Sequence, residues 1–289
     1  MGSKAAWIAL ALLVVPMFGS YFFDDMFSSV SYLFEHPEFL ELGWDSADYG
    51  FYTSGYSTLC VFGGLIVCGM LLDKWGVRIT GSIFVAMMAG GAALVAWAIT
   101  SGMAPSKSLT AAYAGCMIFG LGSEIAGVGI TRSIAKWFKG REMALAMGLQ
   151  LAVARLGTAF ALILSPRLVA AKAAGQTYTL AETARPAFFG LMLLLLGAVV
   201  WAVFVAMDAS FDRAAGTSDR THKGEEDAFR FTDVFKVLGN KHFIMIALLC
   251  VFFYSSIVSF KKFAGAILIP RFDIPAQTAS WMVSMLPFA

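Results

Sequence analysis

The chain has 289 residues, of which 59% are hydrophobic and only 14% are charged, and its mean hydropathy is +0.75. A soluble domain usually carries about 25% charged residues, so this composition excludes an ordinary soluble protein. The small net charge of +2 and the scatter of histidines and cysteines predict no nucleic-acid partner, no metal site and no cofactor.

The apolar residues come in blocks of about 20 or more, the length with which a helix crosses about 30 Å of hydrocarbon. In lipid, every backbone polar group must be satisfied within the protein, so such blocks indicate helices. A transmembrane barrel would need alternating segments of about 10 residues, and the sequence has none. We therefore expect an all-α membrane protein.

Eight apolar blocks predict transmembrane helices. In chain order they cover residues 7–34, 49–72, 79–100, 109–137, 142–169, 186–207, 243–270 and, from 277 onward, the start of an eighth helix. The first block is too long for the apolar core of a signal peptide, and no small-residue cleavage site follows it. We expect it to stay as the first helix.

A polar stretch separates the sixth block from the seventh. Phe231, Val234, Phe235 and Leu238 share one helical face there, which predicts a short amphipathic helix on the membrane surface. Thr232 or Asp233 could cap it. The expected organisation is a six-helix bundle over 1–207, a cytoplasmic linker over 208–240, and the start of a second bundle over 241–289.

Six helices, a long loop and further helices are typical of transporters built from two six-helix halves. Ala289 falls within the predicted eighth helix. We therefore expect a fragment, truncated from twelve helices.

Basic residues are concentrated in alternate loops, which orients the chain in the membrane. Lys74, Arg78, Lys136, Lys139 and Arg141 fall in two of these short loops, and the long loop on the same side is also basic. This pattern predicts a cytoplasmic N-terminus and an acidic first loop that faces outside or a lumen.

The loop between the second and third helices carries a spaced motif, with Gly69, Asp73, Lys74, Gly76 and Arg78 in the pattern G-x-x-x-D-[RK]-x-G-x-[RK]. Gly69 would let helices approach closely, and Gly76 would permit a tight turn. Asp73 could accept from a helix N-terminus across the bundle interface. This motif resembles the signature of the major facilitator superfamily, where it implies a conformational latch. The alternative is a generic basic turn.

Glu124 and Arg155 lie near the middle of the fourth and fifth predicted helices. A charge at bilayer depth costs about 2.5–3.5 kcal/mol on insertion scales, so each must face a cavity or a partner. Adjacent antiparallel helices would place the two at similar depth, and we expect them to pair. The pair would either bind a charged solute or only lock the bundle.

Two more charged pairs lie in the first and seventh helices, Asp24 with Asp25 and Lys261 with Lys262. If the halves repeat, both helices line a central cavity, with acids on one wall and bases on the other. Such a cavity would suit a solute with an ammonium and a carboxylate. The alternative is that these side chains reach the outer membrane interface.

The stretch from Trp137 to Gly157, with Gly122-Ser-Glu124 before it and Phe260-Lys261-Lys262-Phe263 after it, resembles the lysosomal dipeptide transporter branch of the superfamily and its bacterial relatives. The resemblance implies uniport of dipeptides, often cationic, with an accessory membrane glycoprotein. It implies substrate roles for Glu124 and Arg155. It also implies a lysosomal membrane in a eukaryote or the inner membrane in a bacterium.

Three functions remain open at this point. The first is a dipeptide uniporter that works by alternating access. The second is a proton-coupled symporter of organic anions or amino acids, with Glu124 as the proton site. The third is a receptor or scaffold in the lipid bilayer that binds its ligand without transport. An enzyme is not expected, because no catalytic set or phosphate loop is present.

Overall fold

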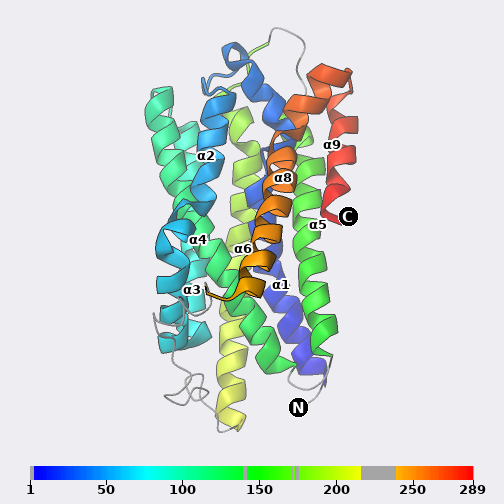
Figure 1. The fold of residues 1–289 in the computed structure, drawn as a ribbon. Helices are drawn as coiled ribbons and strands as arrows, with labels where there is room; N and C mark the ends of the chain where they lie inside the picture. Colours follow the sequence, from blue (N-terminus) through cyan, green and yellow to red (C-terminus); the bar gives the residue numbers. More distant parts are fainter. Residues whose placement is uncertain (1–2, 139–141, 171, 173–175, 216–238, 289) are drawn as a thin grey trace.

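The computed structural model describes residues 3–138, 142–170, 172, 176–215 and 239–288. Within these ranges the regular secondary structure is helical, apart from one isolated bridge between Leu40 and Tyr178. The long helices stand side by side in one bundle (Figure 1). Six segments of this part are long and apolar enough to cross a membrane. The predicted amphipathic surface helix lies outside the described residues, and so do Lys139 and Arg141 in the loop between α4 and α5.

The elements follow the predicted order. They are α1 (Ser3–Asp25), η1 (Ser28–Glu35), η2 (Pro37–Phe39), α2 (Ser46–Leu59), a π-helical turn η3 (Cys60–Gly64), α3 (Leu65–Thr100), α4 (Pro105–Trp137), α5 (Met143–Val169), α6 (Leu180–Ala215), α8 (Lys241–Phe272), α9 (Ala276–Ser284) and η5 (Leu286–Phe288).

Local sequence explains where several helices begin. Asp45 and Asp48 form a capping box at the start of α2, in which each side chain accepts from the other residue's backbone N–H. Pro105 occupies the first turn of α4, where a missing N–H has no consequence. Asn240 caps α8 by accepting from the backbone of His242 and Phe243.

The first helix is shorter than predicted. It ends at Asp25, and residues 28–35 form the 3-10 helix η1 instead of continuing the α-helix to residue 34. Residues 28, 29 and 31 are serines, which have a lower intrinsic helix propensity than the alanines and leucines of the earlier turns of α1. The Ser28 hydroxyl donates to the Asp25 carboxylate.

The predicted turn at Gly76 is confirmed. Gly76 has φ 78° and ψ 170°, a conformation that only glycine adopts easily. A methyl group added at Gly55 would lie 3.2 Å from Cys116 Cβ, and one added at Gly91 would lie 2.6 Å from the Gly115 carbonyl oxygen. Both glycines are therefore level with the same turn of α4. The chain between them reverses at Gly76 and makes two spans out of the apolar stretch Ser46–Thr100.

The two ends of the bundle differ in how α8 is held. At the end where the N-terminus lies, the Trp7 ring packs on Phe138, 5.1 Å between centroids. There most residues of the first half of α8, from Phe243 to Tyr254, are exposed. At the opposite end, hereafter the far end, Lys262, Ala264 and Gly265 are buried against η1. Within the described residues, α8 is therefore fastened to the bundle only through its second half.

Candidate functional site

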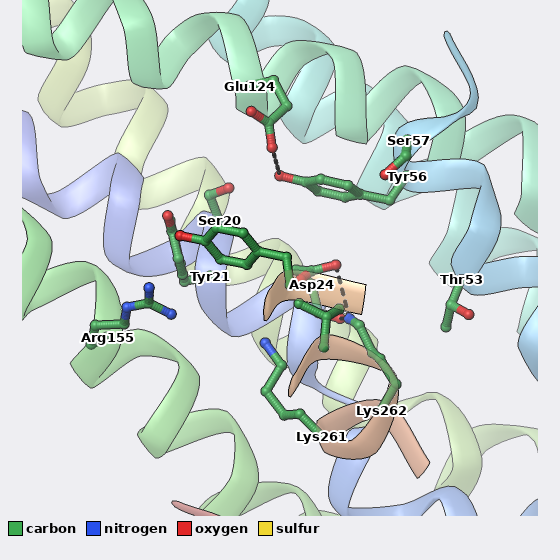
Figure 2. A pocket seen from close by; sticks show the side chains of 12 residues that line it. Ser20, Tyr21, Asp24, Thr53, Tyr56, Ser57, Glu124, Arg155, Lys261 and Lys262 are labelled. Atoms are coloured by element: carbon green, nitrogen blue, oxygen red, sulfur yellow. Dashed lines mark hydrogen bonds and ion pairs between the residues drawn. The ribbon is translucent and has the colours of Figure 1, made fainter. Parts of the chain in front are cut away.

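A cavity of about 500 Å³ lies between α1, α2, α4, α5 and α8 (Figure 2). Its lining residues are Ser20, Tyr21, Asp24, Thr53, Tyr56, Ser57, Glu124, Arg155, Tyr254, Val258, Lys261 and Lys262. Five of the six charged residues that the sequence predicts to bind a solute line it. The sixth, Asp25, lies behind the wall with 0% exposure. Small-ligand sites are typically cavities of about 300–1,000 Å³.

Glu124 presents its carboxylate to this cavity from α4. The Tyr56 hydroxyl donates to Glu124 Oε1 at 2.8 Å and lies 3.2 Å from the Ser123 hydroxyl. Ser123 in turn bonds to Ser20 of α1 at 2.5 Å. Tyr56 can reach Glu124 because α2 and α4 touch at Gly120, where an added methyl group would lie 2.1 Å from the Tyr56 carbonyl oxygen.

Arg155 enters the cavity from α5 and is half-buried. None of the described residues forms a hydrogen bond or ion pair with its guanidinium. The predicted direct pair with Glu124 is therefore wrong. The two side chains come from different sides of the cavity, and Tyr21 projects into the space between them (Figure 2). A similar depth along the bundle did not bring the two side chains together, because each points from its own helix toward a different wall of the cavity.

The four charges of α1 and α8 form a cluster at the far end of the cavity. The Lys261 amine lies 2.7 Å from Asp25 Oδ2. The Lys262 amine lies 2.9 Å from Asp24 Oδ1 and 3.2 Å from Asp25 Oδ1. Thr158 of α5 also donates to Asp25 Oδ2, at 2.8 Å. The acids on α1 and the bases on α8 are in direct contact and are not separated by an open cavity. They neutralise each other across the contact between α1 and α8.

The motif of the Gly76 turn is only partly explained by the structure. Arg132 of α4 donates to Asp73 Oδ1 at 2.7 Å, so the described contact of Asp73 is within its own bundle. Lys74 is exposed. The expected close approach at Gly69 is not seen, because no atom of the described residues lies within 4 Å of a methyl group added there.

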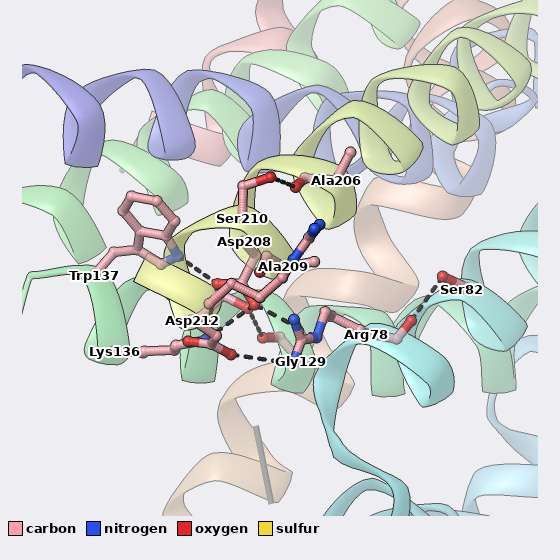
Figure 3. A network of polar contacts seen from close by, with 12 residues as sticks. Arg78, Ser82, Gly129, Lys136, Trp137, Ala206, Asp208, Ala209, Ser210 and Asp212 are labelled. Atoms are coloured by element: carbon pink, nitrogen blue, oxygen red, sulfur yellow. Dashed lines mark hydrogen bonds and ion pairs between the residues drawn. The ribbon is translucent and has the colours of Figure 1, made fainter. Parts of the chain in front are cut away.

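Arg78, the last residue of the motif, takes part in a polar network. It pairs with Asp212 at 3.1 Å and Asp208 at 3.8 Å (Figure 3). Lys136 lies 2.9 Å from a carboxylate oxygen of each of these acids, and the Trp137 indole N–H donates to Asp208 at 2.8 Å. This network joins α3, α4 and α6 at the end of the bundle that carries the N-terminus.

Sequence reasoning missed this network because it ended the sixth helix at Met207 and assigned Asp208 to the linker. α6 instead continues to Ala215, and both acids are buried on it. Their spacing of four residues, which places both on one helical face, was an available signal. Tyr56 was also missed, since a tyrosine within an apolar block gives no indication of its partner.

A bundle of apolar helices around a charged cavity defines an integral, multi-pass membrane protein. The chain belongs to the Major Facilitator Superfamily, whose family model matches residues 17–289. That is a family of membrane transporters and not of enzymes.

Curated relatives carry one name, "Lysosomal dipeptide transporter MFSD1". The chain is 23% identical to the Mus musculus protein and 24% identical to the Homo sapiens protein, with 96% of this chain and 57% of each relative covered. It is 26% identical to the Danio rerio protein over 79% of this chain and 47% of the relative. The chain therefore spans about half the length of these relatives.

Proposed function

We propose that the protein is a uniporter of cationic or zwitterionic dipeptides that works by alternating access. One observation carries the proposal: Glu124 and Arg155 face the same cavity at membrane depth, and neither has an ionic partner among the described residues. Because each such charge is costly to insert, an arrangement that leaves both open suits a solute that supplies the missing ammonium and carboxylate.

Each end of the solute has two candidate partners. Glu124 and Asp24 would hold its ammonium group, and Arg155 and Lys261 its carboxylate. Asp25 and Lys262 would support these groups from behind. The relatives are named as dipeptide transporters, which favours a solute with both charges.

The motif residues Gly69, Asp73, Lys74, Gly76 and Arg78 would act as the latch between conformations. We also propose a cytoplasmic N-terminus, because Arg78 and Lys136 of the predicted basic loops lie at its end of the bundle. The names of the relatives favour a lysosomal membrane in a eukaryotic source, and a bacterial protein would lie in the inner membrane.

The test is uptake of radiolabelled lysyl-alanine and arginyl-alanine by liposomes that contain the full-length protein. Saturable uptake above that of empty liposomes is expected, and unlabelled dipeptide should compete. Binding without flux would favour the receptor instead, and neither binding nor flux across such dipeptides would end the proposal.

Proton coupling is the second candidate, favoured by the absence of a cation beside Glu124 among the described residues. It would make uptake collapse when a proton ionophore removes the pH gradient at zero membrane potential. Uniport predicts uptake that continues under the same conditions.

A further inference from the structure

We propose that Asp24, Asp25, Lys261 and Lys262 form a clasp that closes the far end of the cavity, and that Lys261 is the member which the carboxylate of a solute draws away. The proposal rests on the proposed function for its solute. It assigns different tasks to two adjacent lysines: Lys262 holds the clasp, and Lys261 releases it.

The contacts of the two lysines differ. The Lys262 amine meets three acceptors, the Asp24 carboxylate, the Asp24 backbone carbonyl and the Asp25 carboxylate. Among the described residues the Lys261 amine meets one acceptor, Asp25 Oδ2, at 2.7 Å. Lys261 also lines both the main cavity and a smaller one of about 270 Å³ beside it, and Arg155 lines both as well. A carboxylate attracted by Arg155 therefore has Lys261 within the same space.

Asp25 can lose Lys261 without becoming an unpaired buried charge. It has 0% exposure, and removing the only partner of such a group is strongly destabilising. After Lys261 leaves, however, Asp25 still has the Lys262 amine at 3.2 Å, the Thr158 hydroxyl at 2.8 Å and the Ser28 hydroxyl at 3.4 Å. When Lys261 moves from the Asp25 carboxylate to the solute carboxylate, each of these charges therefore still has a partner.

The clasp lies next to the contacts that close the far end. Beyond it along α8, the Ala266 backbone N–H donates to the Ser31 hydroxyl at 3.2 Å. The rings of Phe263 and Tyr49 have centroids 5.4 Å apart, and the Tyr49 hydroxyl donates to the Lys262 carbonyl at 3.3 Å. Opening this end requires α8 to leave η1 and α2, which loosening of the clasp would permit.

A buried reporter can measure that opening. The Ser29 hydroxyl is buried without a hydrogen-bond partner, so Ser29→Cys removes no bond. The reporter is placed in full-length protein whose native cysteines are replaced by alanine (Cys60, Cys68, Cys116 and Cys250 in this chain). A membrane-impermeant thiol reagent is then applied to cells from the side on which η1 lies, and the labelling rate is measured.

Without solute, Lys262→Gln should label roughly tenfold faster than Lys261→Gln, because only the first leaves both acids without their shared cation. Equal rates in these two variants would overturn the division between the lysines. Size-exclusion profiles and the charge-keeping variants Lys262→Arg and Lys261→Arg check that folding is intact. If Lys262→Gln does not accumulate, Asp24→Asn replaces it, with the same expected direction.

With solute, lysyl-alanine should accelerate labelling of the reporter protein, and lysyl-alaninamide, which lacks the carboxylate, should not. Lysyl-alanine should have no effect in Lys261→Gln. Acceleration by the amide, or a full response in Lys261→Gln, would overturn the role of Lys261. The solute-free comparison does not depend on transport, so failure of the dipeptide proposal and failure of the clasp give different results.

Discussion

Glu124 and Arg155 face the cavity with their charges open, and their surroundings differ in a way that matters for binding. Glu124 is held by the Tyr56 hydroxyl at 2.8 Å, while the Arg155 guanidinium has no hydrogen-bond partner in the described part of the chain. An oriented carboxylate binds an ammonium without first losing rotamer freedom. The Arg155 guanidinium, without such a bond, can move to meet the carboxylate of a dipeptide, whose position varies with the dipeptide's own side chains.

We expect Glu124→Gln and Arg155→Ala each to abolish dipeptide flux, since each removes the charge that one end of the solute requires. Both proteins should still insert in the membrane in normal amounts. Arg167→Ala is the matched control, because Arg167 is an exposed residue of the same helix as Arg155. Uptake at the wild-type rate by either cavity variant would show that the substituted residue contributes only to packing.

Tyr56→Phe should weaken solute binding by roughly tenfold, the magnitude of one hydrogen bond to a charged group, with little loss of protein stability. Measured KM for uptake would rise more than the maximal rate falls. Tyr113→Phe provides the comparison, since its hydroxyl bonds to Thr58 at 2.9 Å between the same two helices but outside the cavity lining. Equal effects of the two substitutions would contradict the orienting role.

At the scale of elements, close approach of helices places the site. α3 and α4 meet where Gly91 faces Gly115, and α2 and α4 meet where Gly120 faces Tyr56. The polar network of Arg78, Lys136, Asp208 and Asp212 then ties α6 to α3 and α4. The cavity wall is therefore set by contacts that have no role in binding, and these can be tested by stability alone.

Gly91→Ala should destabilise the protein, because the new methyl group would lie 2.5 Å from the Phe119 backbone nitrogen. Overpacking of this kind costs about 1–3 kcal/mol. Gly90→Ala is the neighbouring control, with no described atom within 4 Å, and should be neutral or stabilising by up to about 1 kcal/mol through helix propensity. Thermal unfolding in detergent measures both, and a lower Tm for Gly90→Ala than for Gly91→Ala would refute the packing argument.

Asp208→Asn should lower stability by about 3–5 kcal/mol, the effect of removing one partner from a buried ion pair. The Lys136 amine would lose its bond to Oδ2, and Lys136 and Arg78 would share Asp212 as their remaining acid in this network. Asp273→Asn is the control, since Asp273 is exposed in a left-handed conformation that asparagine tolerates. Unfolding curves that coincide for the two variants would show that the network contributes nothing.

At the scale of the whole molecule, the far end is closed by α8 and the other end leaves the first half of α8 exposed. In the proposed alternating-access cycle, α8 would have to separate from η1, because the contacts between them close the far end. A disulfide between Ser31→Cys and Ala266→Cys, whose parent residues are hydrogen-bonded, should stop uptake, and reduction should restore it. Uptake that continues with the cross-link fully formed would contradict this motion, and the single-cysteine variants serve as controls.

Much of this architecture follows from hydropathy and spacing. Apolar blocks predicted the helices, and a glycine in a basic motif predicted the reversal at Gly76. The separation of Glu124 from Arg155 could not be predicted, because depth in the membrane does not fix the direction a residue takes around its helix. Asp208 and Asp212 were assigned to the linker because hydropathy falls at Met207, although buried partners let the helix continue.

In the proposed transporter, Arg155 binds the carboxylate of a dipeptide and Glu124 binds its ammonium group. Equilibrium binding of lysyl-alanine and lysyl-alaninamide to purified full-length protein, Arg155→Gln and Glu124→Gln tests it most directly. The amide should bind the wild type and Glu124→Gln roughly tenfold more weakly than the acid does, and Arg155→Gln should lose most of this preference. An undiminished preference for the acid in Arg155→Gln would contradict the account.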